Sequence, residues 1–441
     1  MRKIILAIGL GVLSFMSCKK EYTTINNSTI NNSTQVDTGI VVSNNITSLI
    51  TFSQVQSMVK NETLKIRLNR TGFEVREYTA YFESATLVEG ERLIYCRIPG
   101  IVIGSGDSGS PLYTKDGKLI GALCYGFSGD NHQFIARAID DLLSISNKTK
   151  SNNESIDLAS HGLYSIKSAY KCNGFTKEFI NRLLSRNPNN ILSQFEVVNS
   201  SEIIPNSKLK INTVSNIIPG MSATVLEGIG NLTLMGSTGT ISYIDKYNRM
   251  YAYGHHYSKD YSPISAPVFL ADMKFFVDSY LESFKESDFT DQFIGSMTAD
   301  SYYGVLFDPT AKEQMFDSRI ALKIYNNDSI IYSHTLSNNT VTNYEYDMTA
   351  NITSLGLYKN RTTFIGKYSK VTGTIITKTT NGITTDSISF NTLTSNIDLD
   401  LYDVIADKCI EYTHHIIDQK ISLSITSSTY ADSVLVPIIK K

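Results

Sequence analysis

The sequence predicts a mainly β protein, and three observations support that fold class. The 441-residue chain carries 26 Tyr and 19 Phe and is rich in Thr, Ile and Ser, which are residue types that favour strands. Residues 64–68 (Leu-Lys-Ile-Arg-Leu) alternate between apolar and polar side chains, as a half-buried strand does. Asp116-Gly117 and Asn381-Gly382 each join two such segments, and these dipeptides are strong hairpin signals. The length indicates two or three domains.

The charge balance argues against a nucleic-acid-binding protein. The chain holds 40 basic and 42 acidic side chains, whereas phosphate binding needs a clustered basic surface. The five cysteines are too few for a disulfide scaffold in a chain of this length.

The N-terminus predicts export. Arg2 and Lys3 precede an apolar run, residues 4–15, that is shorter than the ~20 residues needed to span a bilayer. Residues 1–17 therefore read as a cleaved signal peptide. Ser17-Cys18 at its end resembles a bacterial lipoprotein signal, in which the cysteine is lipidated and becomes the mature N-terminus. An ordinary signal followed by a chance cysteine is the alternative, since Phe15 departs from the usual aliphatic residue.

The chain after the signal divides into five parts by composition and pattern. The part after Cys18 nearly repeats an Asn-Asn-Ser-Thr unit and is too polar to fold alone, which predicts a flexible tether that holds the folded part away from a membrane. The predicted parts are a tether (18–48), a half that carries a serine motif (49–150), a connector with a helix (151–210), a half that carries a histidine motif (211–308) and a β-rich C-terminal domain (309–441).

Three helical patterns interrupt the strands. Thr176 caps a predicted helix whose apolar residues Phe179, Ile180, Leu183 and Leu184 share one face. Residues 402–417 predict a second helix. The segment 263–284 fits a helix by its spacing, although its β-rich surroundings favour a strand.

The chemistry begins at residues 104–111, Gly-Ser-Gly-Asp-Ser-Gly-Ser-Pro. An acyl-transfer nucleophile needs an exposed hydroxyl on a sharp turn, together with amides aimed at the developing oxyanion. Glycines on both sides of Ser108 permit such a turn. In Gly-Asp-Ser-Gly turns of serine proteases, the amides equivalent to Gly106 and Ser108 form the oxyanion hole. A Gly/Ser-rich hairpin loop is the alternative.

A serine nucleophile usually needs a histidine base, and all seven histidines follow Ser108 in the chain. The His, Asp, Ser order of trypsin-like proteases is therefore excluded, so the domain is either permuted or inactive. The best base is His255, which follows Gly254 at the end of a predicted hairpin made by residues 238–245 and 249–254.

These two segments together resemble the SpoIVB-type serine peptidases, a permuted branch of the chymotrypsin-like proteases. The resemblance rests on Ser108-Gly-Ser-Pro, on Gly-Lys-Leu-Ile-Gly-Ala at 117–122, on Thr-Gly-Thr-Ile-Ser-Tyr-Ile-Asp at 238–245 and on Gly254-His255. Residues 134–143 are also similar to the segment that non-sporulation bacterial members place after the serine hairpin. The similarity covers about 50–307 well and the C-terminal part loosely.

The resemblance implies a permuted chymotrypsin-like double β-barrel with an additional β-rich C-terminal domain. It makes Ser108 the nucleophile and His255 the general base. Asp107 replaces the methionine of the family turn, and we expect its carboxylate to anchor the turn. The aspartate that the family places upstream of the serine is missing, so either Glu91 or Glu89 substitutes for it or the site is a Ser–His dyad.

The sequence therefore predicts a cofactor-free serine endopeptidase-like protein of the bacterial cell envelope, held to a membrane by its N-terminal lipid and acting on protein or peptide substrates. No metal site is expected, because the metal-binding spacings of His and Cys are missing. A catalytically inactive surface lipoprotein that uses the protease fold for binding or assembly is the alternative. Cys96 and Cys124 either form a disulfide or remain buried thiols.

Overall fold

The protein was analysed as a computed structural model, and the predicted signal peptide and Cys18 lie outside the residues that it describes. Short 3-10 helices within the described part span Leu143–Asn147, Ile191–Gln194, Arg361–Thr363 and Thr394–Asn396. The described residues are 39–43, 45, 48–127, 129–147, 162–172, 175–194, 196–198, 212–213, 216–230, 234–257, 266–278, 283–311, 318–326, 328–338, 345–364, 368–410 and 416–428.

The described chain is mainly β, as expected, and its first sheet closes into a six-stranded antiparallel barrel. The barrel order is β3-β2-β5-β6-β7-β4, and β4 pairs back onto β3. β1, from the end of the predicted tether, pairs with β3, and β8 pairs with β6. The bounds are β1 (Ile40–Val42), β2 (Thr63–Thr71), β3 (Glu74–Val88), β4 (Glu91–Arg97), β5 (Pro111–Thr114), β6 (Leu119–Phe127), β7 (Asp130–Ala138) and β8 (Leu163–Ser165), with helices α1 (Phe52–Gln56) and α2 (Ile139–Leu142).

Alternating side chains fill this barrel. Leu64, Ile66 and Leu68 of β2 are fully buried and belong to the barrel core with Phe134 of β7. The expected Asp116-Gly117 turn joins β5 to β6, and Gly117 takes the left-handed backbone (φ 86°) that this turn requires.

The second sheet contains a second closed circuit of antiparallel pairings. Its order is β13-β14-β17-β16-β15-β12, and β12 also pairs with β13. The bounds are β9 (Ala169–Cys172), β10 (Glu196–Val198), β11 (Asn212–Thr213), β12 (Ser222–Gly230), β13 (Leu234–Ile244), β14 (Met250–Ala252), β15 (Pro267–Val277), β16 (Phe284–Ser301) and β17 (Gly304–Asp308), with α3 (Lys177–Arg186) in the connector.

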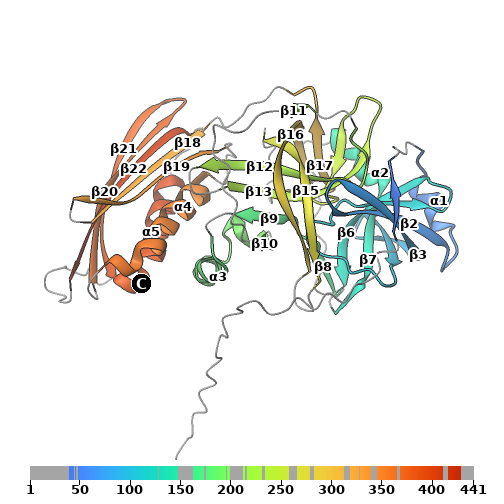
Figure 1. Cartoon of the computed structure of the whole chain (residues 1–441), viewed down its shortest axis with the longest axis horizontal. Coiled ribbons are helices and arrows are strands. Elements are labelled where there is room, and N and C mark those ends of the chain that lie inside the picture. The colour runs from blue at the N-terminus through green and yellow to red at the C-terminus, as the bar shows by residue number, and fades with distance from the viewer. Residues whose placement is uncertain are drawn as a thin grey trace, which may run out of the picture. The chain divides into compact units, whose positions relative to one another are not determined.

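The same sheet continues into the C-terminal part through the pairing of β12 with β19. The order there is β19-β18-β22-β20-β21, and helices α4 and α5 pack against each other beside these strands (Figure 1). The bounds are β18 (Ser318–Asn326), β19 (Ser329–Asn338), α4 (Glu345–Asn360), β20 (Tyr368–Thr379), β21 (Gly382–Leu393), α5 (Ile397–Ile410) and β22 (Ile416–Ser428).

Several local predictions can be compared directly with these elements. The hydroxyl of Thr176 accepts a hydrogen bond from Phe179 N and caps α3 as expected. The ambiguous segment 263–284 contains strand β15, whose pairing with β12 and β16 overrides its helical spacing. The helix expected at 402–417 begins earlier, at Ile397, and ends at Ile410. Among the described helices, none is long and apolar enough to cross a membrane.

Candidate active site

The serine motif forms a tight turn between β4 and β5. Gly106 and Gly109 both have left-handed backbones, with φ of 90° and 88°. Asp107 N donates to Gly104 O (3.0 Å), and Ser110 N donates to Asp107 O (2.9 Å). The two glycines that flank Asp107-Ser108 therefore permit the sharp reversal that places Ser108 at the tip of the turn.

The carboxylate of Asp107 lies inside the protein and faces two cations. Its Oδ2 accepts from Gly104 N (3.1 Å) and lies 3.0 Å from Arg70 Nη2. Its Oδ1 lies 3.3 Å from the ammonium nitrogen of Lys285, and both of these side chains are fully buried. Burial lowers the pKa of Lys285 to about 8, although the nearby carboxylate favours its charged form. These contacts tie the serine turn to β2 and β16.

The strand that carries the second motif holds the serine turn from the other side. Thr240 N donates to Ser108 O (2.9 Å), and the Thr240 hydroxyl donates to Gly106 O (3.0 Å). The hydroxyl of Ser242 donates to Gly109 O (2.7 Å). A methyl group on Gly109 would lie 2.2 Å from Thr240 O and 2.5 Å from Tyr253 N. The two motifs found in the sequence thus meet backbone to backbone.

His255 follows a strained corner at the end of β14. Tyr253, a residue with a full side chain, has a left-handed backbone (φ 67°), and Gly254 has the same conformation (φ 66°). The Tyr253 hydroxyl is buried and donates to Ser237 O (2.6 Å), which fixes the corner. Left-handed backbone at a residue with a full side chain is found preferentially at functional sites.

The ring of His255 is held in one protonation state. Its Nδ1 lies 2.7 Å from the backbone O of His256, and because a carbonyl only accepts, Nδ1 carries the proton. Nε2 is then the basic nitrogen; it is buried and makes no well-formed hydrogen bond among the described residues, with the backbone of Ile166 beside the ring. Burial lowers the pKa of His255 to about 4, so the imidazole is neutral at pH 7.

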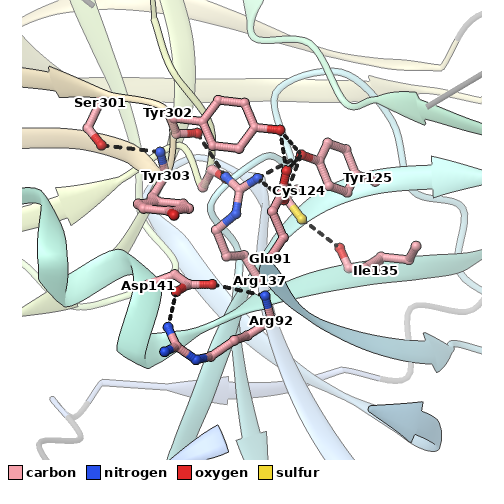
Figure 2. Close-up of polar contacts among 11 residues, drawn as sticks. Glu91, Arg92, Cys124, Tyr125, Ile135, Arg137, Asp141, Ser301, Tyr302 and Tyr303 are labelled. Atoms are coloured by element: carbon pink, nitrogen blue, oxygen red, sulfur yellow. Dashed lines mark hydrogen bonds and ion pairs between the residues drawn. The ribbon is translucent and has the colours of Figure 1, made fainter. Parts of the chain in front are cut away.

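Glu91, one of the two acids expected to orient the histidine, instead forms a buried ion pair with Arg137 (Figure 2). Arg137 Nη2 donates to Glu91 Oε2 (2.6 Å) and to the Tyr125 hydroxyl (2.6 Å). The hydroxyl of Tyr302 also donates to Glu91. Arg137 is fully buried, and its other amino group, Nη1, donates to Gly254 O (2.7 Å) and Tyr302 O (3.0 Å).

The Glu91–Arg137 pair therefore reaches the histidine indirectly. It fixes the carbonyl of Gly254, the residue before His255, whereas the imidazole Nδ1 is oriented by the backbone of His256. Glu89, the other expected acid, is exposed and lies in the turn between β3 and β4. Among the described residues neither expected acid contacts the imidazole, whose orienting acceptor is the backbone carbonyl of His256, and no hydrogen bond joins Ser108 Oγ to His255 Nε2.

The Ser108 hydroxyl and the amide of Gly106 are both enclosed. Ser108 has no exposed surface, and its Oγ has no hydrogen-bond partner within the described part of the chain. The amide of Gly106, half of the expected oxyanion hole, donates to Lys167 O (2.9 Å). A buried polar atom without a partner is costly, and such atoms occur at sites where another group binds or reacts.

The described part of the chain shows neither a metal-binding cluster nor a disulfide near the serine motif. Among the described His, Cys, Asp and Glu side chains, no group of three or more is arranged to hold a metal ion. Cys96 and Cys124 are buried free thiols, and burial raises the pKa of Cys124 to about 12.

Four supporting residues were not identified from the sequence. Arg70 and Lys285 are single cationic residues in strands, far from the serine in the chain, and carry no recognisable pattern. Thr240 belongs to the quoted Thr-Gly-Thr motif and Arg137 to the quoted segment 134–143, so membership of these segments was the signal available for these two.

A comparison with models of known protein families found no match, and a search of curated proteins found no similar sequence.

Proposed function

We propose that this chain is an exported serine peptidase-like protein in which Ser108 is the nucleophile and His255 the general base. The observation that carries the proposal is the direct contact between the serine turn and the strands that end at His255, together with two buried atoms, Ser108 Oγ and His255 Nε2, that make no hydrogen bond among the described residues. We also propose that the two closed circuits of strands correspond to the permuted chymotrypsin-like double barrel of the SpoIVB-type peptidases.

In this mechanism the neutral imidazole removes the Ser108 proton as Oγ attacks the carbonyl carbon of a peptide bond. The amides of Gly106 and Ser108 then receive the negative oxygen of the tetrahedral intermediate. The protonated Nε2 of His255 gives its proton to the leaving amine, and water releases the acyl group by the reverse sequence. The His256 carbonyl stabilises the imidazolium less than a carboxylate does, which predicts slow turnover.

The location of the protein is part of the proposal. Lipidation of Cys18 anchors the chain to a membrane of the bacterial cell envelope, and protein or peptide substrates reach it there. No step of the proposed mechanism requires a cofactor.

A second function is favoured by one specific observation. Ser108 is fully buried, and the Gly106 amide is already hydrogen-bonded to Lys167 O. A protein that has kept the protease fold only for binding or assembly has no need of an accessible nucleophile.

Labelling with a fluorophosphonate, which reacts with activated serines, separates the two functions. Wild-type protein should form an adduct on Ser108 during prolonged exposure, whereas Ser108→Ala and His255→Ala should not. Ser144→Ala, a change at a partly buried serine of the barrel half, serves as the matched control and should label like wild type. Equal labelling of all four proteins would rule out the peptidase mechanism.

A further inference from the structure

A short stretch of the chain itself runs along the serine site. Strand β8 pairs antiparallel with β6, the second strand after the nucleophile, with Leu163 opposite Phe127 and Tyr164 opposite Gly126. The pairing continues one residue further, since Ile166 N donates to Cys124 O (3.1 Å). The segment Leu163–Ile166 is therefore added alongside β6, and Lys167 and Ser168 follow it outside the strand.

The backbone of this segment then contacts both the serine turn and the histidine ring. Lys167 O accepts the hydrogen bond of Gly106 N (2.9 Å), the amide assigned to the oxyanion. The backbone of Ile166 lies beside the His255 ring. A carbonyl in the oxyanion hole and a strand paired alongside the nucleophile are the positions that a peptide substrate needs for attack.

Two side chains of the segment point into apolar surroundings. Leu163 is buried in a cluster with Leu93 and Ile135, and Ile166 is fully buried against the barrel core. Tyr164, between them, lies over Gly126 and stays 38% exposed. The surroundings of this segment thus accept apolar side chains at its first and fourth positions.

We propose that Leu163–Ser168 is an internal substrate mimic, which closes the serine site and marks the class of peptide that the site binds. That class is an extended peptide with aliphatic residues three positions apart and a backbone carbonyl presented to Gly106. The inhibitory role of the segment rests on the proposed peptidase function, whereas binding of a peptide in place of the segment is independent of catalysis. It also accounts for the complete burial of Ser108.

A reversible disulfide tests whether the segment must leave. The bond from Ile166 N to Cys124 O makes that pair a hydrogen-bonded one, so Leu163 and Phe127 form a non-hydrogen-bonded pair, with Cα atoms about 4.5 Å apart. That spacing suits a disulfide. Leu163→Cys with Phe127→Cys is built in a Cys124→Ser background, which removes the neighbouring thiol. A Lys378→Cys with Ile383→Cys pair, opposite each other on exposed β20 and β21, is the matched control.

Oxidation of the Leu163–Phe127 pair should slow fluorophosphonate labelling of Ser108 at least about tenfold, the effect of roughly 1.4 kcal/mol, and a reductant should restore it. The control pair should label equally in both states. Equal labelling of the oxidised and reduced Leu163–Phe127 pair overturns the mimic while leaving Ser108 as the nucleophile.

Peptide binding gives a readout without catalysis. A fluorescent peptide with the sequence of residues 162–168 is titrated against the same cysteine pair in a Ser108→Ala background. The reduced protein should bind at least about tenfold more tightly than the oxidised one, and a peptide with Asp in place of both aliphatic residues should not bind. Redox-dependent binding without any labelling in the serine-containing protein supports the mimic and rejects the peptidase function.

Ile166→Ala, which weakens the hold of the segment, provides the last arm. It should raise the labelling rate and the peptide affinity over those of wild type. If neither this variant nor the reduced pair binds the peptide or reacts, the segment is a permanent part of the fold and the proposal is wrong.

Discussion

Replacing Glu91 by Gln removes one charge of the buried pair that fixes the corner before His255. Glu91 is 1% exposed and Arg137 is fully buried, and an arginine cannot lose its proton inside a protein. The variant keeps a side-chain oxygen that can accept from Arg137, but it leaves the buried guanidinium without a negative charge to compensate it; the Tyr125 hydroxyl and two backbone carbonyls remain as neutral partners. Breaking a buried ion pair from one side costs about 3–5 kcal/mol, and we expect that loss in the free energy of unfolding.

The magnitude is measured by urea denaturation followed by circular dichroism, with Glu74→Gln as the control. Glu74 pairs with Arg76 on the half-exposed surface, where an ion pair contributes about 0–1 kcal/mol. Labelling of Ser108 should fall together with the stability of Glu91→Gln, because the Gly254 carbonyl loses a firmly held donor.

A double variant separates the stability effect from the positioning effect. Adding Arg137→Met to Glu91→Gln removes the unpaired charge and should recover part of the lost stability. It leaves the carbonyls of Gly254 and Tyr302 without their donor, at about 1–3 kcal/mol each, so labelling of Ser108 should stay low. A loss below about 1 kcal/mol in Glu91→Gln, the range of an exposed pair, or full labelling in the double variant, would refute the positioning role.

Three further predictions follow from the geometry of the site. Ser108→Ala should leave the free energy of unfolding unchanged or raise it by about 1 kcal/mol, because it removes a buried hydroxyl without a partner; a clear loss in urea denaturation would show that Oγ is satisfied. Gly109→Ala should destabilise strongly, since its methyl group would clash with three backbone atoms of Thr240 and Tyr253. Gly129→Ala, at a similar φ of 86° with nothing within 4 Å, isolates the backbone strain alone, so equal losses in thermal denaturation would contradict the close approach. Burial lowers the pKa of His255 and of His334 to about 4, so the unfolded chain takes up these protons before the folded protein does. The free energy of unfolding should therefore fall by up to about 1.4 kcal/mol per pH unit for each histidine as the pH drops from about 6.5 to 4. His334→Gln should flatten that slope, and an unchanged slope in urea titrations at several pH values would contradict the burial of a neutral ring.

Local signals predicted the parts of the fold in which the local preference and the tertiary structure agree. Thr176 begins α3 because its side chain satisfies a backbone amide within the same turn. Gly117 marks a hairpin for a similarly local reason. Helix α4 was not predicted from the sequence because its residues 349–358 are all buried. A helix buried on every side has no alternation between an apolar and a solvent-exposed polar face, and that alternation is the signal that predicts a helix.

The candidate site was predicted only as far as its short motifs extend. The motifs around Ser108 and His255 lie in contact, but the partners of Asp107 and Glu91 come from distant strands. Arg137 and Lys285 became recognisable only through burial and pairing, which depend on the whole fold. The sequence left open whether Glu91 or Glu89 replaces the missing aspartate. Glu91 reaches the Gly254 carbonyl through Arg137, and an indirect contact of this kind has no sequence signature.

The pH dependence of Ser108 labelling in wild type and in His255→Ala tests the central claim most directly. The nucleophile needs a neutral imidazole, and burial lowers the pKa of His255 to about 4. The wild-type adduct, located on Ser108 by mass spectrometry, should therefore form at a rate that is half-maximal near pH 4 and level above about pH 5, and His255→Ala should form almost none. An adduct that forms equally fast in both proteins would contradict the account. So would a wild type that gives no adduct at any pH even when the segment Leu163–Ser168 is released.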